Sequence, residues 1–424
     1  MNPNTELIPH LFRTEFRKIV SVLSKHFGLN HIEIAEDIVS DTFLIASETW
    51  GLKGLPENPT AWLYSVAKNK AKDHLKRNEL FTKKIANEIK RTESSLYEQD
   101  IDLTTQNIED SQLQMMFAVC HPAIAPEAQI GLALRILCGL GIEEIAEAFL
   151  TNKETTNKRL FRAKEKLREV NAQMQFPAKE ELDARLDSVL SVLYLLFNEG
   201  YYSASQNISL RKDLCLEAMR LNLLLIENQR TNKPFVNALL SLMCFHASRF
   251  EARISESGET ILYDEQDTSL WDRELILRGE YYLNQASVGN VISKYHVEAA
   301  IAYWHTQTNR EFEKWENILQ LYNKLLQIDY SPMAALNRTY ALAKARDCET
   351  AIREAEKLEL EESHWYHALL GELYTVIDQQ KAHAYFQKAI ALSKTDADRS
   401  VLQKKKNQME VTLASEPVKK HNTQ

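Results

Sequence analysis

Glycine and proline are scarce in this chain of 424 residues, which contains 11 Gly and 10 Pro. Together they make up about 5 % of the residues, against about 12 % in an average protein. Strand-rich folds need many turns, and turns depend on these two residues. The scarcity therefore argues against a sheet-based fold and predicts an all-α chain with short loops.

Signals for export or membrane insertion are missing as well. No stretch of about 18 apolar residues is present, so we expect no membrane-spanning helix. The first ten residues, MNPNTELIPH, have neither the basic nor the apolar part of a secretory signal. The five cysteines are scattered, odd in number and without a C-x-x-C pair, which indicates reduced core thiols. We therefore expect a cytoplasmic protein without disulfides or a structural metal.

Motifs of common enzyme classes are also absent. The sequence contains no G-x-G-x-x-G, P-loop, H-E-x-x-H or G-x-S-x-G pattern. Cys244 and His246 lie in an apolar run that is more typical of a core than of a metal site. The N-E-G-Y-Y segment at 198–202 could form a ligand-binding corner, but a helix that ends at glycine explains it more simply. We expect no enzyme, no cofactor and no bound metal.

The charge is unevenly distributed along the chain, although the net charge is only −8. Residues 68–91 carry nine Lys or Arg against three acids, and residues 153–168 carry seven against two. Between them, residues 93–110 hold six acids and no base. Two basic helices separated by an acidic linker are typical of a nucleic-acid-binding protein, and the net charge of the whole chain does not show this pattern.

The second basic helix follows a short amphipathic helix after a break of about three residues, Thr151-Asn152-Lys153. This arrangement predicts a helix-turn-helix. Because Thr156, Leu160, Ala163 and Leu167 form its buried stripe, the opposite face is free to contact bases and phosphates. That face carries six candidate DNA-binding residues, with Thr155 alternatively capping the first turn: Thr155, Asn157, Lys158, Arg159, Arg162 and Lys166.

The first basic helix mixes aromatic and basic side chains, a combination that suits unpaired bases and their backbone. Its candidate residues are Trp62, Asn69, Lys70, Asp73, His74 and Arg77. Trp62 could equally be a core anchor.

The preceding helix has an acidic outer face, on which Phe43 lies off the expected buried stripe of Ala35, Ile38, Val39, Thr42 and Ile45. Acids around an exposed aromatic favour docking onto a basic protein surface, although a solvated face explains the acids as well. The candidate docking residues are Asp37, Asp41, Phe43 and Glu48.

Three segments in this order resemble the extracytoplasmic-function sigma factors of bacterial RNA polymerase. They are A-E-D-I-V-S-D-T-F-L at 35–44, N-P-T-A-W-L-Y-S-V-A-K-N-K-A-K-D-H-L-K-R at 58–77, and the helix-turn-helix at 141–168. The resemblance implies that the acidic helix docks on core polymerase, that the first basic helix reads the −10 element, and that the second reads the −35 element. The acidic linker would thread toward the polymerase cleft.

C-H-P-A-I-A-P-E-A-Q at 120–129, N-E-G-Y-Y at 198–202 and a repeat-like C-terminal end resemble the subgroup of these factors with a large C-terminal extension. Near the end of the chain, three sets of apolar residues share one internal spacing and follow one another after 33 and 31 residues, a period close to that of tetratricopeptide (TPR) repeats. The sets are Ile318/Tyr322/Leu325, Ala351/Ala355/Leu358 and Ala382/Phe386/Ala389. The expected divisions are 1–80 for sigma region 2, 81–110 for a flexible linker, 111–172 for sigma region 4, 173–290 for a helical extension, 291–400 for TPR-like repeats and 401–424 for a tail.

The function expected from this reading is promoter-specific initiation with core RNA polymerase and promoter DNA as partners. The extension is expected to regulate initiation, through a regulatory protein or through the sigma domains themselves. The alternative is an ordinary helix-turn-helix repressor or activator with a TPR-type interaction domain.

Overall fold

The computed structural model describes residues 4–85, 101–149, 151–202, 208–255, 261–308, 311–393 and 396–415. Helices joined by short connections make up these ranges, and no strand occurs in them, so the all-α prediction is confirmed. None of the described helices combines the length and apolarity that crossing a bilayer requires. The chain forms two compact units, an N-terminal unit of Met1–Gly200 with Leu216–Glu227 and a C-terminal unit of Tyr201–Cys215 with Asn228–Gln424.

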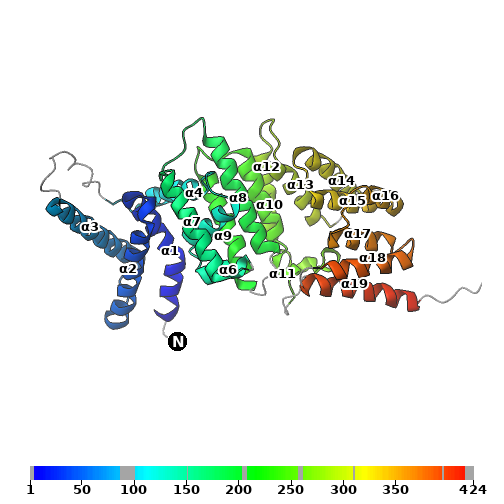
Figure 1. The fold of residues 1–424 in the computed structure, drawn as a ribbon, viewed down its shortest axis with the longest axis horizontal. Helices are drawn as coiled ribbons and strands as arrows, with labels where there is room; N and C mark the ends of the chain where they lie inside the picture. Colours follow the sequence, from blue (N-terminus) through cyan, green and yellow to red (C-terminus); the bar gives the residue numbers. More distant parts are fainter. Residues whose placement is uncertain are drawn as a thin grey trace, which may run out of the picture. The chain divides into compact units, whose positions relative to one another are not determined.

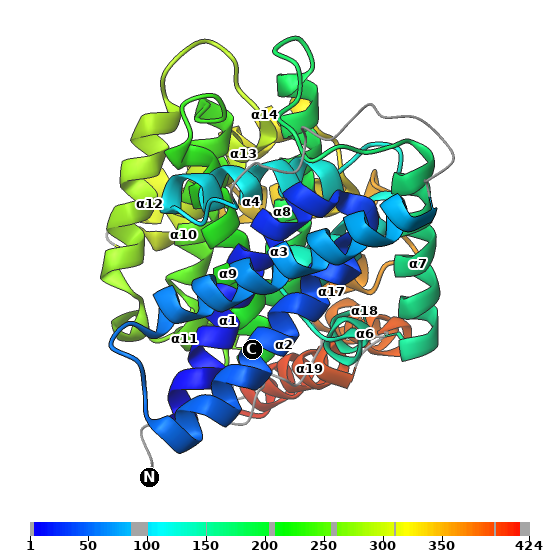
Figure 2. The same ribbon diagram turned by 90° about the vertical axis from the view of Figure 1, so that its left-hand side faces the viewer.

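The N-terminal unit begins with three long helices, α1 (Asn4–Phe27), α2 (Ile32–Lys53) and α3 (Pro59–Ile85), with a short turn η1 (Leu29–His31) before α2. Helix α1 packs against both α2 and α3 (Figures 1 and 2). The predicted inner face of α2 is buried at Ala35, Ile38, Val39 and Thr42, while Ile45 is half-buried. The hydroxyl of Thr42 donates to the carbonyl of Ile38 at 2.8 Å, so this buried polar group is satisfied.

A second group of helices follows in the same unit: α4 (Thr105–Val119), α5 (Pro126–Leu132), a π-helical turn η2 (Ala133–Leu137), α6 (Ile142–Ala148) and α7 (Lys153–Glu169). Helix α4 packs against α1, which joins this group to the first three helices. Gly139 follows η2 with φ +64°, and a Cβ atom there would lie 2.2 Å from Nε of Arg17. Only glycine therefore fits this junction.

Helices occupy both ends of the segment expected to be a linker, residues 81–110. Helix α3 continues to Ile85, and α4 begins at Thr105. Ile101 is 1 % exposed, so the chain is already anchored in the core before α4 starts. Residues 86–100, which carry part of the acidic run, lie outside the described residues.

The first helices of the extension do not form a body of their own. Helix α8 (Leu182–Tyr202) up to Gly200 and the end of α9 (Ile208–Glu227) belong to the N-terminal unit. Arg185 of α8 donates to the carbonyl of Phe117 at 2.5 Å, and Glu217 of α9 lies 3.7 Å from the guanidinium of Arg17. These parts of α8 and α9 are thus built into the unit that contains the helix-turn-helix.

The C-terminal unit starts with α10 (Pro234–Ala247), α11 (Phe250–Arg253), the turns η3 (Tyr263–Glu265) and η4 (Thr268–Leu270), α12 (Arg273–Ala286) and α13 (Lys294–Thr306). Helix α10 is buried on nearly all sides because it packs against both α12 and α13. At Gly279 of α12 the helices approach so closely that a Cβ atom would lie 2.6 Å from the ring of Phe245. The hydroxyl of Ser241 donates to the Gly279 carbonyl at 2.8 Å.

Six further helices stack in order in the same unit: α14 (Glu311–Ile328), α15 (Pro332–Ala345), α16 (Cys348–Glu356), α17 (His364–Tyr374), α18 (Gln379–Leu392) and α19 (Asp396–Ser415). The three recurring sets fall on alternate helices, α14, α16 and α18, and their side chains are buried or half-buried. Helix α19 covers much of the expected tail, and its Leu402 and Met409 are buried in this core. The spacing of the recurring sets thus corresponds to two helices of this stack, with Leu358 lying just after the end of α16.

Candidate nucleic-acid interface

Helices α6 and α7 form the predicted helix-turn-helix in the N-terminal unit. Helix α7 begins at Lys153, and the side chain of Asn152 caps it by accepting the Thr155 backbone N–H at 2.8 Å. The capping role considered for Thr155 thus falls to Asn152. Helix α7 packs against α5 and α6, and its buried residues are the predicted four: Thr156, Leu160, Ala163 and Leu167.

The outer face of α7 is exposed at all six predicted −35 positions: Thr155, Asn157, Lys158, Arg159, Arg162 and Lys166. Two of the lysines form ion pairs along the helix, Lys158 with Glu154 at 2.6 Å and Lys166 with Glu169 at 2.9 Å. Exposed pairs of this kind are worth at most about 1 kcal/mol, so a phosphate can replace the carboxylate. The face is therefore free to receive DNA.

The candidate −10 residues of α3 divide into two groups. Asn69, Asp73 and Arg77 are exposed, as a surface that binds unpaired bases requires. Trp62, Lys70 and His74 are half-buried and make contacts inside the fold. The Trp62 ring packs edge-on against Trp50 at 5.3 Å, His74 packs against Phe27 at 5.7 Å, and Lys70 lies 3.0 Å from Asp41. Trp62 is thus held by the core of this helical group.

Phe43 is buried, which corrects the expectation that it is an exposed aromatic. It is 5 % exposed and packs against Phe12 and Phe16, with ring centroids 5.1 and 6.2 Å apart. The reason lies in the spacing, because Phe43 follows Val39 by four residues and precedes Ala46 by three, which places all three on one face. The buried face of α2 is wider than the stripe that ends at Ile45.

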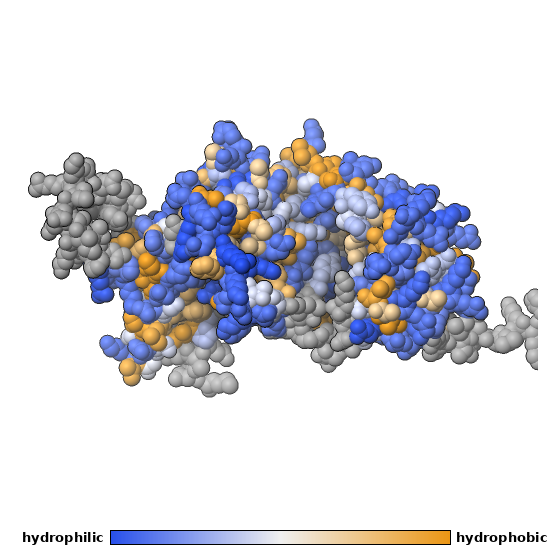
Figure 3. Space-filling view, viewed as in Figure 1, coloured by the Kyte–Doolittle hydropathy of each residue, from blue (hydrophilic) through white to orange (hydrophobic). Residues whose placement is uncertain are grey.

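Leucines provide the exposed apolar surface that Phe43 does not. Leu44 and Leu52 on α2 and Leu55 just beyond it are 59 %, 88 % and 41 % exposed, and Phe12 of α1 is 43 % exposed. Figure 3 shows apolar side chains gathered over α1 and α2. The predicted docking residues Asp37, Asp41 and Glu48 are exposed on α2 too. Sequence reasoning missed Leu52 and Leu55, although apolar residues in a Gly- and Pro-rich loop were a usable signal.

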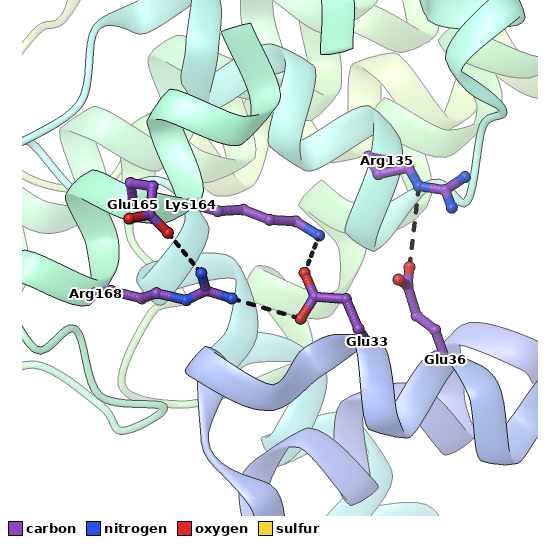
Figure 4. A network of polar contacts seen from close by, with 6 residues as sticks. All are labelled: Glu33, Glu36, Arg135, Lys164, Glu165 and Arg168. Carbon is purple, nitrogen blue, oxygen red and sulfur yellow. Dashed lines mark hydrogen bonds and ion pairs between the residues drawn. The ribbon is translucent and has the colours of Figure 1, made fainter. Parts of the chain in front are cut away.

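The N-terminal end of α2 contacts the C-terminal half of α7 through ion pairs (Figure 4). Glu33 lies 2.8 Å from Lys164 and 3.7 Å from Arg168, and Glu36 lies 4.0 Å from Arg135. Burial alone would raise the pKa of Glu33, but the hydrogen bond from Lys164 and the two positive charges lower it overall. For the more deeply buried Glu36, burial dominates and raises the pKa.

A shallow pocket lies beside these ion pairs. Its lining includes the apolar side chains of Leu29, Ile32, Ile136 and Leu167. The helix that carries the acidic face and the helix that carries the basic face are therefore held together at one point. Among the residues that the structure describes, no cluster of His, Cys, Asp and Glu is able to hold a metal ion.

Comparisons with known proteins agree with the N-terminal part of this reading. Residues 11–80 match sigma-70 region 2, and residues 185–287 match a family of unknown function (DUF6596). An uncharacterized protein of Rhizobium meliloti, R00370, is 31 % identical over 371 residues, which covers 86 % of this chain and 87 % of the relative. No solved structure matches the chain. The chain therefore belongs to one family with the rhizobial protein, and its residues 11–80 are similar to region 2 of the sigma-70 factors.

Proposed function

We propose that this protein is an extracytoplasmic-function sigma factor that binds core RNA polymerase and starts transcription at specific promoters in the cytoplasm. The observation that carries the proposal is the fully exposed basic face of α7 on a helix-turn-helix, in one chain with a sigma-70 region 2. Each side chain type suits its task, since arginine binds guanine bidentately, asparagine suits adenine, and lysine neutralises phosphate.

Polymerase docking is assigned to the outer face of α2. Acidic side chains at Asp37, Asp41 and Glu48 surround the exposed Leu44 on this face. A protein interface of this type joins an apolar anchor with a charged rim, which steers the partner and fixes the register. Phe43 supports the face from beneath, because its ring holds α2 against α1.

Promoter reading is assigned to two helices. In α3, the exposed Asn69, Asp73 and Arg77 hold the melted −10 strand, with Lys70 and His74 beside them. In α7, the six exposed residues read the −35 element from the major groove. By their positions, −10 and −35, the two elements lie about 25 base pairs apart, or about 85 Å along B-DNA at about 3.4 Å per base pair.

This separation has a consequence for the contact between α2 and α7. Glu33 and Lys164 lie 2.8 Å apart, whereas helices that read both elements at once stand tens of ångströms apart. The ion pairs of Figure 4 must therefore break when the factor engages its promoter. We infer from this contact that the protein has a closed form, in which α2 and α7 are held together.

The extension is assigned a regulatory role with a TPR-like architecture. The paired helices α14 to α19 and the alternate placement of the recurring sets support the architecture. The hydrogen bond from Arg185 to Phe117 and the ion pair of Glu217 with Arg17 support the role, because they tie α8 and α9 to the promoter-reading unit. Its partner is either a regulatory protein or these sigma helices themselves.

Reconstituted transcription tests the proposal. Purified protein added to core polymerase without another sigma factor is expected to yield transcripts from defined start sites. The double substitution Arg159→Ala and Arg162→Ala should abolish these transcripts, while the control Arg278→Ala, an exposed arginine of α12, should not. If the protein binds an operator but yields no transcript with core enzyme, the repressor alternative is correct and the sigma assignment is wrong.

A further inference from the structure

Three segments of the C-terminal unit bring cationic and aromatic side chains together. The end of α8 contributes Tyr201 and Tyr202, the α10–α11 junction contributes Arg249 and Arg253, and α14 contributes Lys314. The guanidinium carbon of Arg253 lies 4.4 Å from the centroid of the Tyr201 ring and 4.9 Å from that of Tyr202. The cluster joins two motifs that looked unrelated in the sequence, N-E-G-Y-Y and the apolar run that ends at His246.

The positive charges of this cluster are buried to an unusual extent. Arg249 is 7 % exposed and Lys314 is 6 % exposed. Lys314 donates to the hydroxyl of Tyr263 at 2.6 Å, and the Arg249 guanidinium lies 5.3 Å from the same ring. Lysine and arginine are rarely buried to this degree without a negative partner, because the loss of hydration is costly.

The two arginines lack such a partner within the described part of the chain. No carboxylate there lies within ion-pair distance of Arg249 or Arg253, and the Nε atoms of both are buried without a hydrogen bond. The other polar contact of Arg249 is with a histidine, at 3.5 Å from Nδ1 of His246.

The positive charges of the cluster also affect the pKa values of the two histidines beside it. Burial and the charge of Arg249 lower the pKa of both His246 and His305, with Arg253 adding to the effect at His246 and Lys314 at His305. Both rings are therefore neutral near pH 7 and add no charge of their own beside Arg249 and Arg253. Nδ1 of His305 is also buried without a hydrogen bond in the described residues.

We propose that this cluster is a binding site for a small organic anion, whose carboxylate or phosphate group is bound by Arg249 and Arg253. Guanidinium groups match both oxyanions through paired N–H donors, and Lys314 adds a third positive charge. Tyr202, 56 % exposed, marks where the cluster reaches the solvent and where the ligand enters. Six of the residues named here fall within the segment 185–287 that matches the family of unknown function, so the site assigns a ligand class to that segment.

Thermal unfolding and calorimetric titration of the full chain test this site. Inorganic phosphate and succinate serve as probes for the two oxyanions, and sodium chloride at equal ionic strength serves as the blank. At least one probe is expected to raise the unfolding temperature in a saturable manner and to bind at one site per chain. Which probe binds tells whether the site takes a phosphate or a carboxylate.

Arg253→Gln and the control Lys212→Gln decide whether binding occurs at the cluster. Lys212 is an exposed lysine that pairs with Glu251 near the cluster. The Arg253 variant is expected to lose at least tenfold in affinity while its unfolding temperature without ligand stays equal or rises, because one of two neighbouring positive charges without a carboxylate partner in the described residues has been removed. The Lys212 variant should bind as the unaltered protein does. Absence of saturable binding by both probes, or equal affinity in the Arg253 variant, would overturn the proposal.

Discussion

Substitution of Lys164 by glutamate should loosen the contact between α2 and α7. Lys164 is the strongest cationic partner of Glu33, at 2.8 Å, and it is not among the six residues assigned to the −35 element. The change places two carboxylates where an ion pair stood, at a position where Glu165 already neighbours Arg168. It therefore acts on the contact while leaving the proposed DNA-reading side chains in place.

The size of the effect follows from the exposure of the two partners. The side chain of Glu33 is 48 % exposed and that of Lys164 is 22 % exposed, so solvent screens much of their attraction. A pair of this kind contributes about 0.2–1 kcal/mol, and reversing one charge adds repulsion of similar size. The closed form should lose about 0.4–2 kcal/mol, which corresponds to a shift of about 2- to 30-fold in the ratio of closed to open molecules.

Energy transfer between dyes on Ser47 of α2 and Glu127 of α5, each replaced by cysteine, measures the shift. Both positions are exposed and lie away from the contact. Lys164→Glu should lower the transfer efficiency at 0.05 M salt, and the difference should shrink at 0.5 M salt because added ions screen the charges. Lys153→Glu removes an exposed ion pair with Glu143 at the other end of α7 and is the matched control.

A charge swap provides the decisive comparison. If Glu33→Lys together with Lys164→Glu restores the transfer efficiency, the ion pair itself sets the closed form. If Lys164→Glu leaves the efficiency unchanged at low salt, the reasoning is refuted, and the contacts of α1 with α4 alone hold the two groups of helices together.

Two further predictions concern single side chains. Phe43→Ala should lower the free energy of unfolding by about 3–5 kcal/mol, because it leaves a cavity beside Phe12 and Phe16. Leu44→Ala should keep the stability but weaken binding to core polymerase. If thermal unfolding gives equal unfolding temperatures for the two variants, the buried position of Phe43 is contradicted. Asn152→Ala should lower the free energy of unfolding by about 1 kcal/mol, because it removes the cap on the Thr155 N–H. Asn152→Asp should keep both the cap and the stability. A loss of stability in both variants would mean that the lost cap does not explain the effect.

Helical periodicity predicted the parts of the interface that depend on one helix at a time. The buried stripe of α7 and the exposure of all six outer residues followed from the 3.6-residue repeat. The same repeat placed Phe43 wrongly because the stripe was drawn too narrow, although its distances from Val39 and Ala46 indicate a common face. The recurring sets of the extension likewise predicted which sides of α14, α16 and α18 are buried.

Contacts between distant segments could not be predicted in this way. Glu33 and Lys164 are 131 residues apart, and nothing in either local pattern indicates the other. The apolar residues of α8 and α9 are able to pack against either unit of the chain. The sequence therefore did not show that both helices partly belong to the N-terminal unit. The cluster around Arg253 was overlooked for the same reason, since its tyrosine partners Tyr201 and Tyr202 come from a segment some fifty residues earlier.

Under the proposed function, polymerase docking and the closed contact depend on the same helix. Helix α2 presents Asp37, Asp41, Leu44 and Glu48 outward, while Glu33 at its start binds α7. Because the ion pairs at this contact are individually weak, a protein interface of ordinary size supplies more than enough free energy to separate them. Binding of polymerase to α2 is then able to separate α2 from α7. A ligand of the extension that strengthens the contacts of the extension with Arg17 or Phe117 is expected to oppose this opening.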